Sequence, residues 1–332
     1  MSAWAGDSRS IGVRDMTDAF VLAVDPLRPP QGLEGAVYAI GNFDGLHRGH
    51  QAVIRRALAL AKERHAPSAL LTFEPHPADF FAGRPVAFRL TPQAMKASLC
   101  ERMGLSGLVV LTFDASLATK TAEEFVAEAL VARLDAGAVV VGWDFHFGKG
   151  RAGNPAFLAA ASARYGFEVA IIDKVEEGEG EAARVVSSTA IRRALEEGDV
   201  KAAARGLARP YAVRGRVAPG QRLGRTLGVP TANIALEPTN RLAHGVYAVR
   251  ARVDGLWRPG VASFGVRPTV DDGPPLLEVH LLDFDEDLYG REIEVEFIDR
   301  IRDERKFDSL PALVKEMRRD MDRARSILAL AP

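Results

Sequence analysis

The stretch AVYAIGNFDGLHRGHQAVIRRALALAKERH, residues 36–65, holds the pattern on which the fold of the first half depends. It opens with a continuous apolar run at 36–40 and passes through a glycine-rich turn at 41–49. A helical period follows, which places one set of apolar side chains on a single face: Val53, Ile54, Ala57, Leu58 and Ala61. A continuous apolar run is typical of a strand buried on both faces of a parallel sheet. The stretch therefore predicts a strand, a tight turn and a helix.

Apolar runs of the same kind recur as far as about residue 175, separated by segments with helical period, at 69–73, 108–113, 138–141 and 169–172. Alternation of strand and helix predicts a doubly wound α/β domain with a parallel sheet. Such sheets bind ligands beyond the carboxyl ends of their strands, so the residues that follow each strand are the candidates for function.

After about residue 210 the apolar period changes to two, as in GVYAVRARV at 245–253 and REIEVEFI at 291–298. This alternation predicts antiparallel strands with one solvated face. Turn signals separate them at Asp254-Gly255, Asp272-Gly273 and Tyr289-Gly290. We expect a small antiparallel β-barrel.

A helix is predicted to close the chain, with Ser309 as its N-cap and Pro311 in its first turn. Its expected apolar stripe is Leu310, Leu313, Met317, Met321, Ala324 and Leu328. A helical stretch at 187–209 joins the two halves. The expected layout is a tail at 1–20, a first domain at 21–186, this linker, and a barrel domain at 210–332.

Composition limits the classes of function that the chain can have. The 332 residues are 47% apolar and 26% charged, which is the balance of a globular protein, and the length predicts two domains. The net charge of −1 gives no indication of a nucleic-acid or membrane-surface role. A single cysteine, Cys100, excludes a disulfide framework and predicts a small buried apolar side chain. The first twenty residues lack the apolar core of a signal peptide, and Met16 is a possible start. We therefore expect a cytoplasmic protein, monomeric or weakly homo-oligomeric.

Two histidines lie in the glycine-rich turn, where the first helix is predicted to begin. Gly41, Gly45 and Gly49 allow close approach of the backbone to a ligand, and the helix start favours an anion. His47 and His50, three residues apart, can face one ligand there and stabilise charge on a transferring phosphorus. Their spacing is explained equally well by two histidines that pack together or cap the helix. A zinc site is a poorer explanation, because two histidines supply only two of the four ligands that a structural zinc needs. Asp44 is either part of this site or a turn residue.

Two other phosphate-binding patterns are superficial. GKGRAG at 148–153 fits a dinucleotide-binding fingerprint, but Trp143 to Phe147 separate it from its strand. The segment from Gly142 to Gly150 resembles a P-loop with one residue too many between its glycines and no Ser/Thr for the metal.

A second candidate site lies in the barrel half. Thr231 and Asn233, two apart in VPTANI, would point to one side of an extended segment and offer hard oxygen ligands to Mg²⁺. A proline-bounded turn explains the same residues. Glu278 would share a strand face with His280, opposite the apolar side chains. It is suited to accept a proton from an attacking hydroxyl, or is simply an exposed strand glutamate.

Four blocks of the first half resemble, in order, those of the bacterial bifunctional FAD synthetases, which belong to the adenylyl-transferring nucleotidyltransferases. They are GNFDGLHRGHQ at 41–51, TFEPHP at 72–77, VGWDFHFGKGRAGN at 141–154 and VSSTAIRRAL at 186–195. The resemblance implies that His47 and His50 are catalytic at the phosphates of ATP. It implies a nucleotide-binding role for Gly41, Phe43, Asp44, Gly45, Asp144, Phe147, Arg151, Ser188, Thr189 and Arg192. For Arg192, a solvated surface arginine is the alternative.

The second half resembles riboflavin kinases. The matching blocks are GRTLGVPTANI at 224–234, GVYAV at 245–249, SFGVRPT at 263–269, EVHLLDFDEDLYG at 278–290 and VEFIDRIRDERKFDS at 295–309. The resemblance implies Thr231 and Asn233 at Mg²⁺ and ATP, Gly224 and Arg225 at the nucleotide, Glu278 as catalytic base and Arg302 near the flavin.

Together the resemblances imply one enzyme that phosphorylates riboflavin to FMN and then adenylylates FMN to FAD, with ATP as co-substrate of both steps. A nucleotidyltransferase for another acceptor, such as pantetheine phosphate or nicotinate mononucleotide, is the first alternative, and a flavin-sensing module without activity is the second. The chain departs from the family at Pro219, Ser263 and Trp143. These departures leave the proposed catalytic groups in place but bear on nucleotide affinity and the rim of the flavin site.

Overall fold

The computed structural model describes residues 19–178, 184–219, 228–266 and 275–331. The chain divides into two compact units. The first, which we call the sheet unit, comprises Met1–Gly41, Ile54–Glu74 and Ala97–Ile171. The second, the barrel unit, comprises Asn42–Val53, Pro75–Lys96 and Ile172–Pro332. The chain therefore passes several times between units, and the histidine turn is assigned to the unit that contains the barrel.

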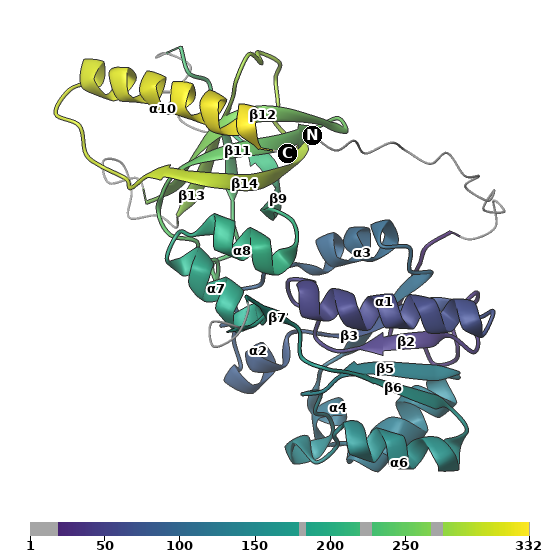
Figure 1. Ribbon diagram of the computed structural model, residues 1–332. Coiled ribbons are helices and arrows are strands. Elements are labelled where there is room, and N and C mark those ends of the chain that lie inside the picture. Colours follow the sequence, from purple (N-terminus) through teal and green to yellow (C-terminus); the bar gives the residue numbers. More distant parts are fainter. Residues whose placement is uncertain (1–18, 179–183, 220–227, 267–274, 332) are drawn as a thin grey trace. The chain divides into compact units, whose positions relative to one another are not determined.

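The sheet unit is built on a six-stranded sheet with the order β1-β4-β3-β2-β5-β6 (Figure 1). Its strands are β1 Val21–Val24, β2 Val37–Ile40, β3 Ser68–Glu74, β4 Gly107–Thr112, β5 Ala138–Gly142 and β6 Glu168–Ile172. The pairs from β1 to β5 are all parallel. The helices that accompany them are α1 Arg48–Glu63, α3 Gln93–Arg102, α4 Ala115–Thr119, α5 Ala122–Glu124, the π-helix η1 Phe125–Arg133, the 3₁₀ turn η2 Lys149–Arg151 and α6 Pro155–Tyr165.

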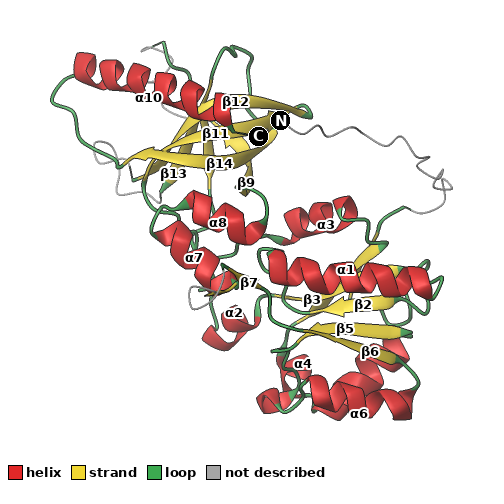
Figure 2. Cartoon of the chain, in the orientation of Figure 1, coloured by secondary structure: helices red, strands yellow, loops and turns green. Residues whose placement is uncertain are grey.

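This arrangement confirms the predicted doubly wound parallel sheet. The five apolar runs form β2 to β6, and the central strands β2 to β5 are buried on both faces. Helices α1 and α6 lie on opposite sides of the sheet (Figure 2). The direction of chain progression reverses between β2 and β5, the point at which such sheets place their ligands. Strand β1 was not predicted, because an edge strand of four residues, with Leu22 and Val24 exposed, has no continuous apolar signature.

The barrel unit contains a closed six-stranded barrel with the order β10-β13-β12-β11-β14-β9. Its strands are β9 Tyr211–Ala218, β10 Ala232–Ala235, β11 Gly245–Val253, β12 Leu256–Gly265, β13 Leu276–Leu281 and β14 Glu292–Arg302. The other elements among the described residues of this unit are α2 Pro77–Ala82, β7 Glu176–Glu177, β8 Arg184–Val185, α7 Ser188–Glu196, α8 Val200–Leu207 and α10 Leu310–Leu330. The predicted barrel is confirmed, and the helical stretch at 187–209 forms α7 and α8.

The predicted turn at Asp254-Gly255 joins β11 and β12 as a two-residue hairpin, with Val253 opposite Leu256. Both turn residues have positive φ, 47° and 83°, which matches the twist of the strands. Tyr289-Gly290 also lies at a turn. Asp272-Gly273 lies outside the described residues.

Helix α10 begins as predicted, because the Ser309 hydroxyl accepts a hydrogen bond from the amide of Ala312 and Pro311 stands in the first turn. Its burial differs from the expected stripe. Leu310 is exposed, and the fully buried positions are Glu316, Asp320 and Ala324. The helix packs on β11, β12 and β14. Apolar periodicity predicted the helix but not that two carboxylates lie on its inner face.

Each buried carboxylate of α10 binds an arginine at or just after the end of β14. Asp320 accepts hydrogen bonds from Arg302 Nε at 3.0 Å and Nη2 at 2.7 Å, and the two side chains are 2% and 15% exposed. Glu316 pairs with Arg305 and Arg319. The two hydrogen bonds between Arg302 and Asp320 fix the distance and the orientation of these side chains. They therefore hold α10 in place on the barrel.

Asp320→Ala should lower the stability of the barrel unit by about 3 kcal/mol, because it leaves the mostly buried guanidinium of Arg302 without the carboxylate that it binds. Asp283→Ala is the matched control. Asp283 also receives two hydrogen bonds from one arginine, Arg325, but these side chains are 72% and 50% exposed. The control should lose less than about 1 kcal/mol. Urea unfolding followed by circular dichroism measures both, and equal losses would contradict the assignment.

Candidate active sites

The turn between β2 and α1 folds its side chains inward. Phe43, Asp44 and Leu46 are each at most 2% exposed. The backbone has positive φ at Phe43 (47°), Gly45 (94°) and Leu46 (46°). Glycine adopts this conformation freely, whereas the other two residues require support from their surroundings. A side chain at Gly45 would also meet Leu90 and Leu207.

The support comes from the Asp44 carboxylate. Its Oδ1 accepts hydrogen bonds from the amides of Leu90 and Thr91, both at 2.9 Å, and its Oδ2 accepts one from Arg192 Nη2 at 2.6 Å. Thr91 Oγ1 in turn accepts a hydrogen bond from the Gly45 amide at 3.0 Å. Asp44 therefore fixes the turn from inside, and its carboxylate oxygens are occupied by protein donors.

His47 and His50 form a stacked pair at the start of α1. Their ring centroids are 3.6 Å apart with an interplanar angle of 20°. The Nδ1 atom of His47 accepts a hydrogen bond from the His50 amide at 3.3 Å, and Phe43 packs edge-on against His50 at 5.0 Å. Gly49 makes room for the first ring, since a Cβ there would lie 3.0 Å from it. Because Nδ1 of His47 is an acceptor, its Nε2 carries the proton as a donor.

Both imidazoles are held in the neutral form. Burial lowers the pKa of His47 to about 4, with Asp44 opposing the shift and Arg192 adding to it. Burial also lowers the pKa of His50 well below its ordinary value, and His47, Lys96 and Arg192 lower it further. Two rings at van der Waals distance cannot both carry charge without strong repulsion. At neutral pH the pair therefore offers N–H donors without a net positive charge.

A second helix start faces the same turn. Helix α7 begins at Ser188, and Ser188 Oγ donates to the Asp44 carbonyl at 2.7 Å. Thr189 is exposed in its first turn. Arg192 Nε donates to the Phe88 carbonyl at 2.8 Å, in addition to its bond to Asp44. The predicted residues Asp44, His47, His50, Ser188 and Arg192 are thus brought together, and we call this group the histidine site.

Three predicted residues of the sheet unit follow β5. Asp144 is exposed, and its carbonyl accepts a hydrogen bond from His146 Nδ1 at 2.8 Å. Phe147 is buried among Phe125, Phe145 and Phe157. Arg151 is exposed, and Gly41 directly follows β2. The ring of Phe147 therefore packs in the core of its unit, and the binding roles of all four residues stay predictions.

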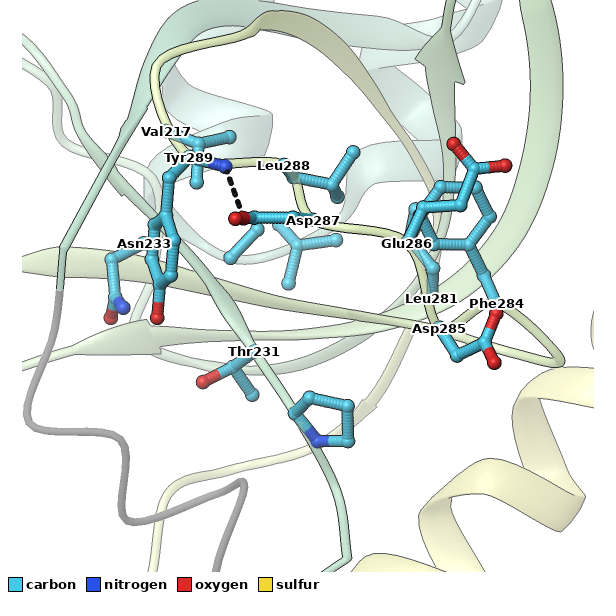
Figure 3. Close-up of a pocket in the computed structure, with 13 residues that line it drawn as sticks. Val217, Thr231, Asn233, Leu281, Phe284, Asp285, Glu286, Asp287, Leu288 and Tyr289 are labelled. Carbon is cyan, nitrogen blue, oxygen red and sulfur yellow. Dashed lines mark hydrogen bonds between the residues drawn. The ribbon is translucent and has the colours of Figure 1, made fainter.

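The barrel unit contains a pocket of about 200 Å³, which we call the barrel pocket. Thr231 and Asn233 line this pocket together with the segment from Phe284 to Tyr289 (Figure 3). Three consecutive carboxylates, Asp285 to Asp287, belong to this segment. Asp287 caps it by accepting a hydrogen bond from the Tyr289 amide at 3.0 Å. The pocket thus combines apolar lining residues with oxygen-bearing side chains.

Glu278 lies on β13 directly opposite Asn233 on β10. Residues opposite one another in a ladder place their side chains on the same face, roughly 5 Å apart at Cβ. Along β13, Leu277, Val279 and Leu281 are buried and Glu278 is half-buried, as the alternation predicted. His280 Nδ1 donates to the Pro230 carbonyl at 2.8 Å and so ties β13 to the segment that carries Thr231.

The remaining predicted residues are placed as follows. Arg302 binds Asp320 and, through Nη1, the carbonyl of Asp303 at 2.9 Å, so it is tied to α10 and to the chain after β14. Gly224 and Arg225 lie outside the described residues. Ser263 stands opposite Glu278 on β12, Trp143 is 50% exposed, and Pro219 follows β9.

Several residues that build these sites were not predicted. Lys96 is 1% exposed, and its Nζ donates to the Asn42 carbonyl at 2.9 Å. The amides of Leu90 and Thr91, which bind Asp44, are backbone groups far along the chain and have no side-chain signature. The acidic residues at 285–287 lay inside a recognised block but carried no expected role. His280 had a signal, since it shares its strand face with Glu278.

Known proteins resemble the chain over most of its length. A family model described as FAD synthetase matches residues 30–190, and one described as Riboflavin kinase matches residues 207–328. A protein of Pseudomonas fluorescens named bifunctional riboflavin kinase/FMN adenylyltransferase is 43% identical over 305 residues, which cover 91% of this chain and 96% of that one. Proteins with the same name from Haemophilus influenzae and Escherichia coli strain K12 are 41% and 40% identical. They are matched over 89% and 90% of this chain and 94% of each relative.

Among solved structures, the crystal structure of a macrolide-efflux protein from Streptococcus pneumoniae has a TM-score of 0.79 and is 32% identical. The match covers 92% of this chain and 99% of that one. Of the helices in the described part of the present chain, none is long and apolar enough to cross a membrane.

The lowered pKa of His47 predicts a pH dependence of stability. The unfolded chain protonates this residue near 6.5, whereas the folded chain does so at about 4. Between these values the unfolded state binds more protons, so stability falls as the pH drops through this window. Urea midpoints measured from pH 7 to pH 5 should decline less steeply in His47→Gln than in the unsubstituted protein. Parallel curves would contradict the burial-driven shift.

Proposed function

The chain belongs to the bifunctional riboflavin kinase/FMN adenylyltransferase family, and we propose that its two reactions are divided between the histidine site and the barrel pocket. The chain is a riboflavin kinase and an FMN adenylyltransferase: it phosphorylates riboflavin to FMN and transfers the adenylyl group of ATP to FMN, giving FAD. The observation that carries the division is the stacked, neutral pair of His47 and His50 at a helix start.

In adenylyl transfer a phosphate oxygen of FMN attacks the α-phosphorus of ATP, and pyrophosphate leaves. Negative charge shifts from the attacking oxygen to the leaving oxygen, so donors placed at the phosphorus lower the barrier. We assign this role to the imidazole N–H groups of His47 and His50 and to the helix starts at α1 and α7. Ser188, Thr189 and the guanidinium of Arg192 border the phosphates from the second helix start. Gly41, Asp144 and Arg151 stay candidates for contacts to the rest of the nucleotide.

Asp44 acts differently from the nucleotide ligand expected from its motif. Its oxygens already accept hydrogen bonds from Leu90, Thr91 and Arg192, and a carboxylate repels phosphate. We propose that Asp44 holds the shape of the turn and that Phe43 and Gly45 serve the same purpose. The nucleotide then meets the backbone of this turn and not the aspartate.

In the kinase reaction the terminal hydroxyl of riboflavin attacks the γ-phosphorus of ATP, and ADP leaves. We propose that Glu278 accepts the proton of that hydroxyl as it attacks. Its place opposite Asn233, beside the barrel pocket, supports the assignment. Arg302 near the flavin, and Gly224 and Arg225 near the nucleotide, remain parts of this proposal.

Mg²⁺ fits the donors at this pocket. The Thr231 hydroxyl, the Asn233 amide oxygen and the carboxylates at 285–287 are the hard oxygen ligands that it prefers. Thr231 and Asn233 would hold the ion, which supplies positive charge to the phosphate oxygens of ATP. The pocket's apolar lining, from Val217, Leu281 and Leu288, is suited to the adenine ring.

Other features of the proposal concern the whole chain. A different phosphorylated acceptor is disfavoured because the Riboflavin kinase match covers the barrel. A sensing module without activity is disfavoured by the intact pair of His47 and His50. We propose a cytoplasmic enzyme whose partners are small molecules, monomeric or weakly homo-oligomeric, without nucleic acid or membrane.

Glu278→Ala should reduce FMN formation from riboflavin by about 10²-fold or more, the usual contribution of a general base. Conversion of supplied FMN to FAD should stay unchanged, because the histidine site is intact. Chromatography of products formed with ATP and Mg²⁺ measures both steps. Glu292→Ala, which removes an exposed glutamate of β14, is the control and should leave both rates unchanged. Near-normal kinase activity of Glu278→Ala would reject the base assignment.

His50→Ala should have the opposite selectivity. Loss of one donor at the reacting phosphorus costs about 10²- to 10³-fold in kcat, so FAD formation should fall by that factor. FMN formation from riboflavin should remain within about twofold of the unsubstituted enzyme. Equal loss of the two activities would argue against separate sites.

A further inference from the structure

Lys96 is a buried cation that the two reactions, as described, leave without a role. It lies in the first turns of α3 and is 1% exposed, one of the largest fully buried side chains of the chain. Lysine is rarely enclosed to this degree, because its ammonium loses the solvation of water. A lysine so enclosed has a specific electrostatic or hydrogen-bonding task more often than a packing task.

Lys96 makes a hydrogen bond to the histidine turn. Lys96 Nζ donates to the carbonyl of Asn42 at 2.9 Å, and Asn42 opens the turn that ends at His47. A hydrogen bond from a charged donor at this carbonyl restrains the peptide plane that joins Asn42 to Phe43.

The turn needs such a restraint because its backbone is strained. Phe43 and Leu46 have φ of 47° and 46°, which non-glycine residues adopt at a cost of about 1 kcal/mol or more each. Asp44 holds the middle of this turn through its carboxylate, and Lys96 holds its beginning. The two contacts come from neighbouring segments, since Leu90 and Thr91 immediately precede α3.

The charge of Lys96 also acts on His50. It is one of three positively charged or chargeable groups, with His47 and Arg192, that lower the pKa of this imidazole in addition to burial. The charge of Asp44 acts on His47 in the opposite sense. The Lys96 cation thus disfavours a positive charge on the His50 ring and preserves the neutral stacked pair.

We propose that Lys96 is a positioning residue for adenylyl transfer: it holds the Asn42 carbonyl and, as a buried cation, keeps the His47–His50 pair in the geometry that meets the phosphates. This inference rests on the assignment of adenylyl transfer to the histidine site. Lys96 makes no contact with the substrates in this scheme and acts through the turn and the imidazoles.

The test compares Lys96→Met, which keeps the length of the side chain and removes the charge, with Lys96→Arg, which keeps the charge. FAD formation from FMN and ATP is measured from pH 5 to pH 9, with FMN formation from riboflavin in the same enzyme as the internal reference. Lys96→Met should lower kcat/KM for FAD formation about tenfold and leave the kinase step unchanged. Its acid limb should move to higher pH, because His50 protonates more readily without the neighbouring cation. Lys96→Arg should keep the acid limb in place.

Arg133→Met is the matched control. Arg133 also donates to a backbone carbonyl, from Nε to Pro26 at 2.9 Å, but this carbonyl belongs to the sheet unit and not to the histidine turn. It should leave the pH profile of FAD formation unchanged.

Three results would overturn the proposal. The first is Lys96→Met with a rate within twofold and an unshifted acid limb, and the second is the same shift in both Lys96 variants. The third is equal loss of both activities in Lys96→Met, because a positioning role in adenylyl transfer spares the kinase step. Failure of the unsubstituted enzyme to form FAD would instead reject the proposed function, which is a distinct outcome.

Discussion

The histidine site depends on a single buried carboxylate. Asp44 is 2% exposed, and an isolated charge at such a depth would cost several kcal/mol. It is tolerated because two backbone amides and one guanidinium bind it. The same bonds gather three segments of the chain, namely the turn before α1, the residues before α3 and the second turn of α7. These bonds also position both imidazoles. The two histidines follow directly on the turn, and the strained backbone of the turn needs the bonds to Asp44 to keep its shape.

Much of the fold could be predicted because the buried faces of strands and helices require apolar residues at regular intervals in the sequence. Strands β2 to β5 are enclosed on both faces and read as continuous apolar runs. Strands β11 and β14 alternate in sequence, although residues 245–249 of β11 are all buried and Glu294 of β14 is buried as well. The failures have the same origin. Strand β1 is an edge strand with one exposed side and so lacks a pattern, and α10 presents Glu316 and Asp320 inward, which apolar periodicity treats as a surface. A charged residue is buried only where it binds a partner, and that partner can lie elsewhere in the chain.

The site was predictable to the extent that its residues are neighbours in sequence. The spacing of His47 and His50 predicted a shared face, and Thr231 and Asn233 were expected to line one site because they are two apart. The residues that complete each site come from elsewhere: Lys96 and the amides before it for the histidines, and His280 and the acidic segment for the barrel pocket. Their contribution depends on tertiary contact, and backbone donors leave no mark in the sequence. The predicted nucleotide contact of Phe147 stays a prediction, and its ring packs in the core of the sheet unit.

The pairing of Asp44 with Arg192 bears on how two activities remain joined in one gene. Arg192 lies beyond residue 190, where the match to the FAD synthetase model stops, and before residue 207, where the match to the Riboflavin kinase model begins. A recombination event that cut the chain at the start of α7 would deliver an adenylyltransferase fragment whose Asp44 has lost its cation. A boundary that preserves the first module therefore falls after Arg192, beyond the end of the FAD synthetase match.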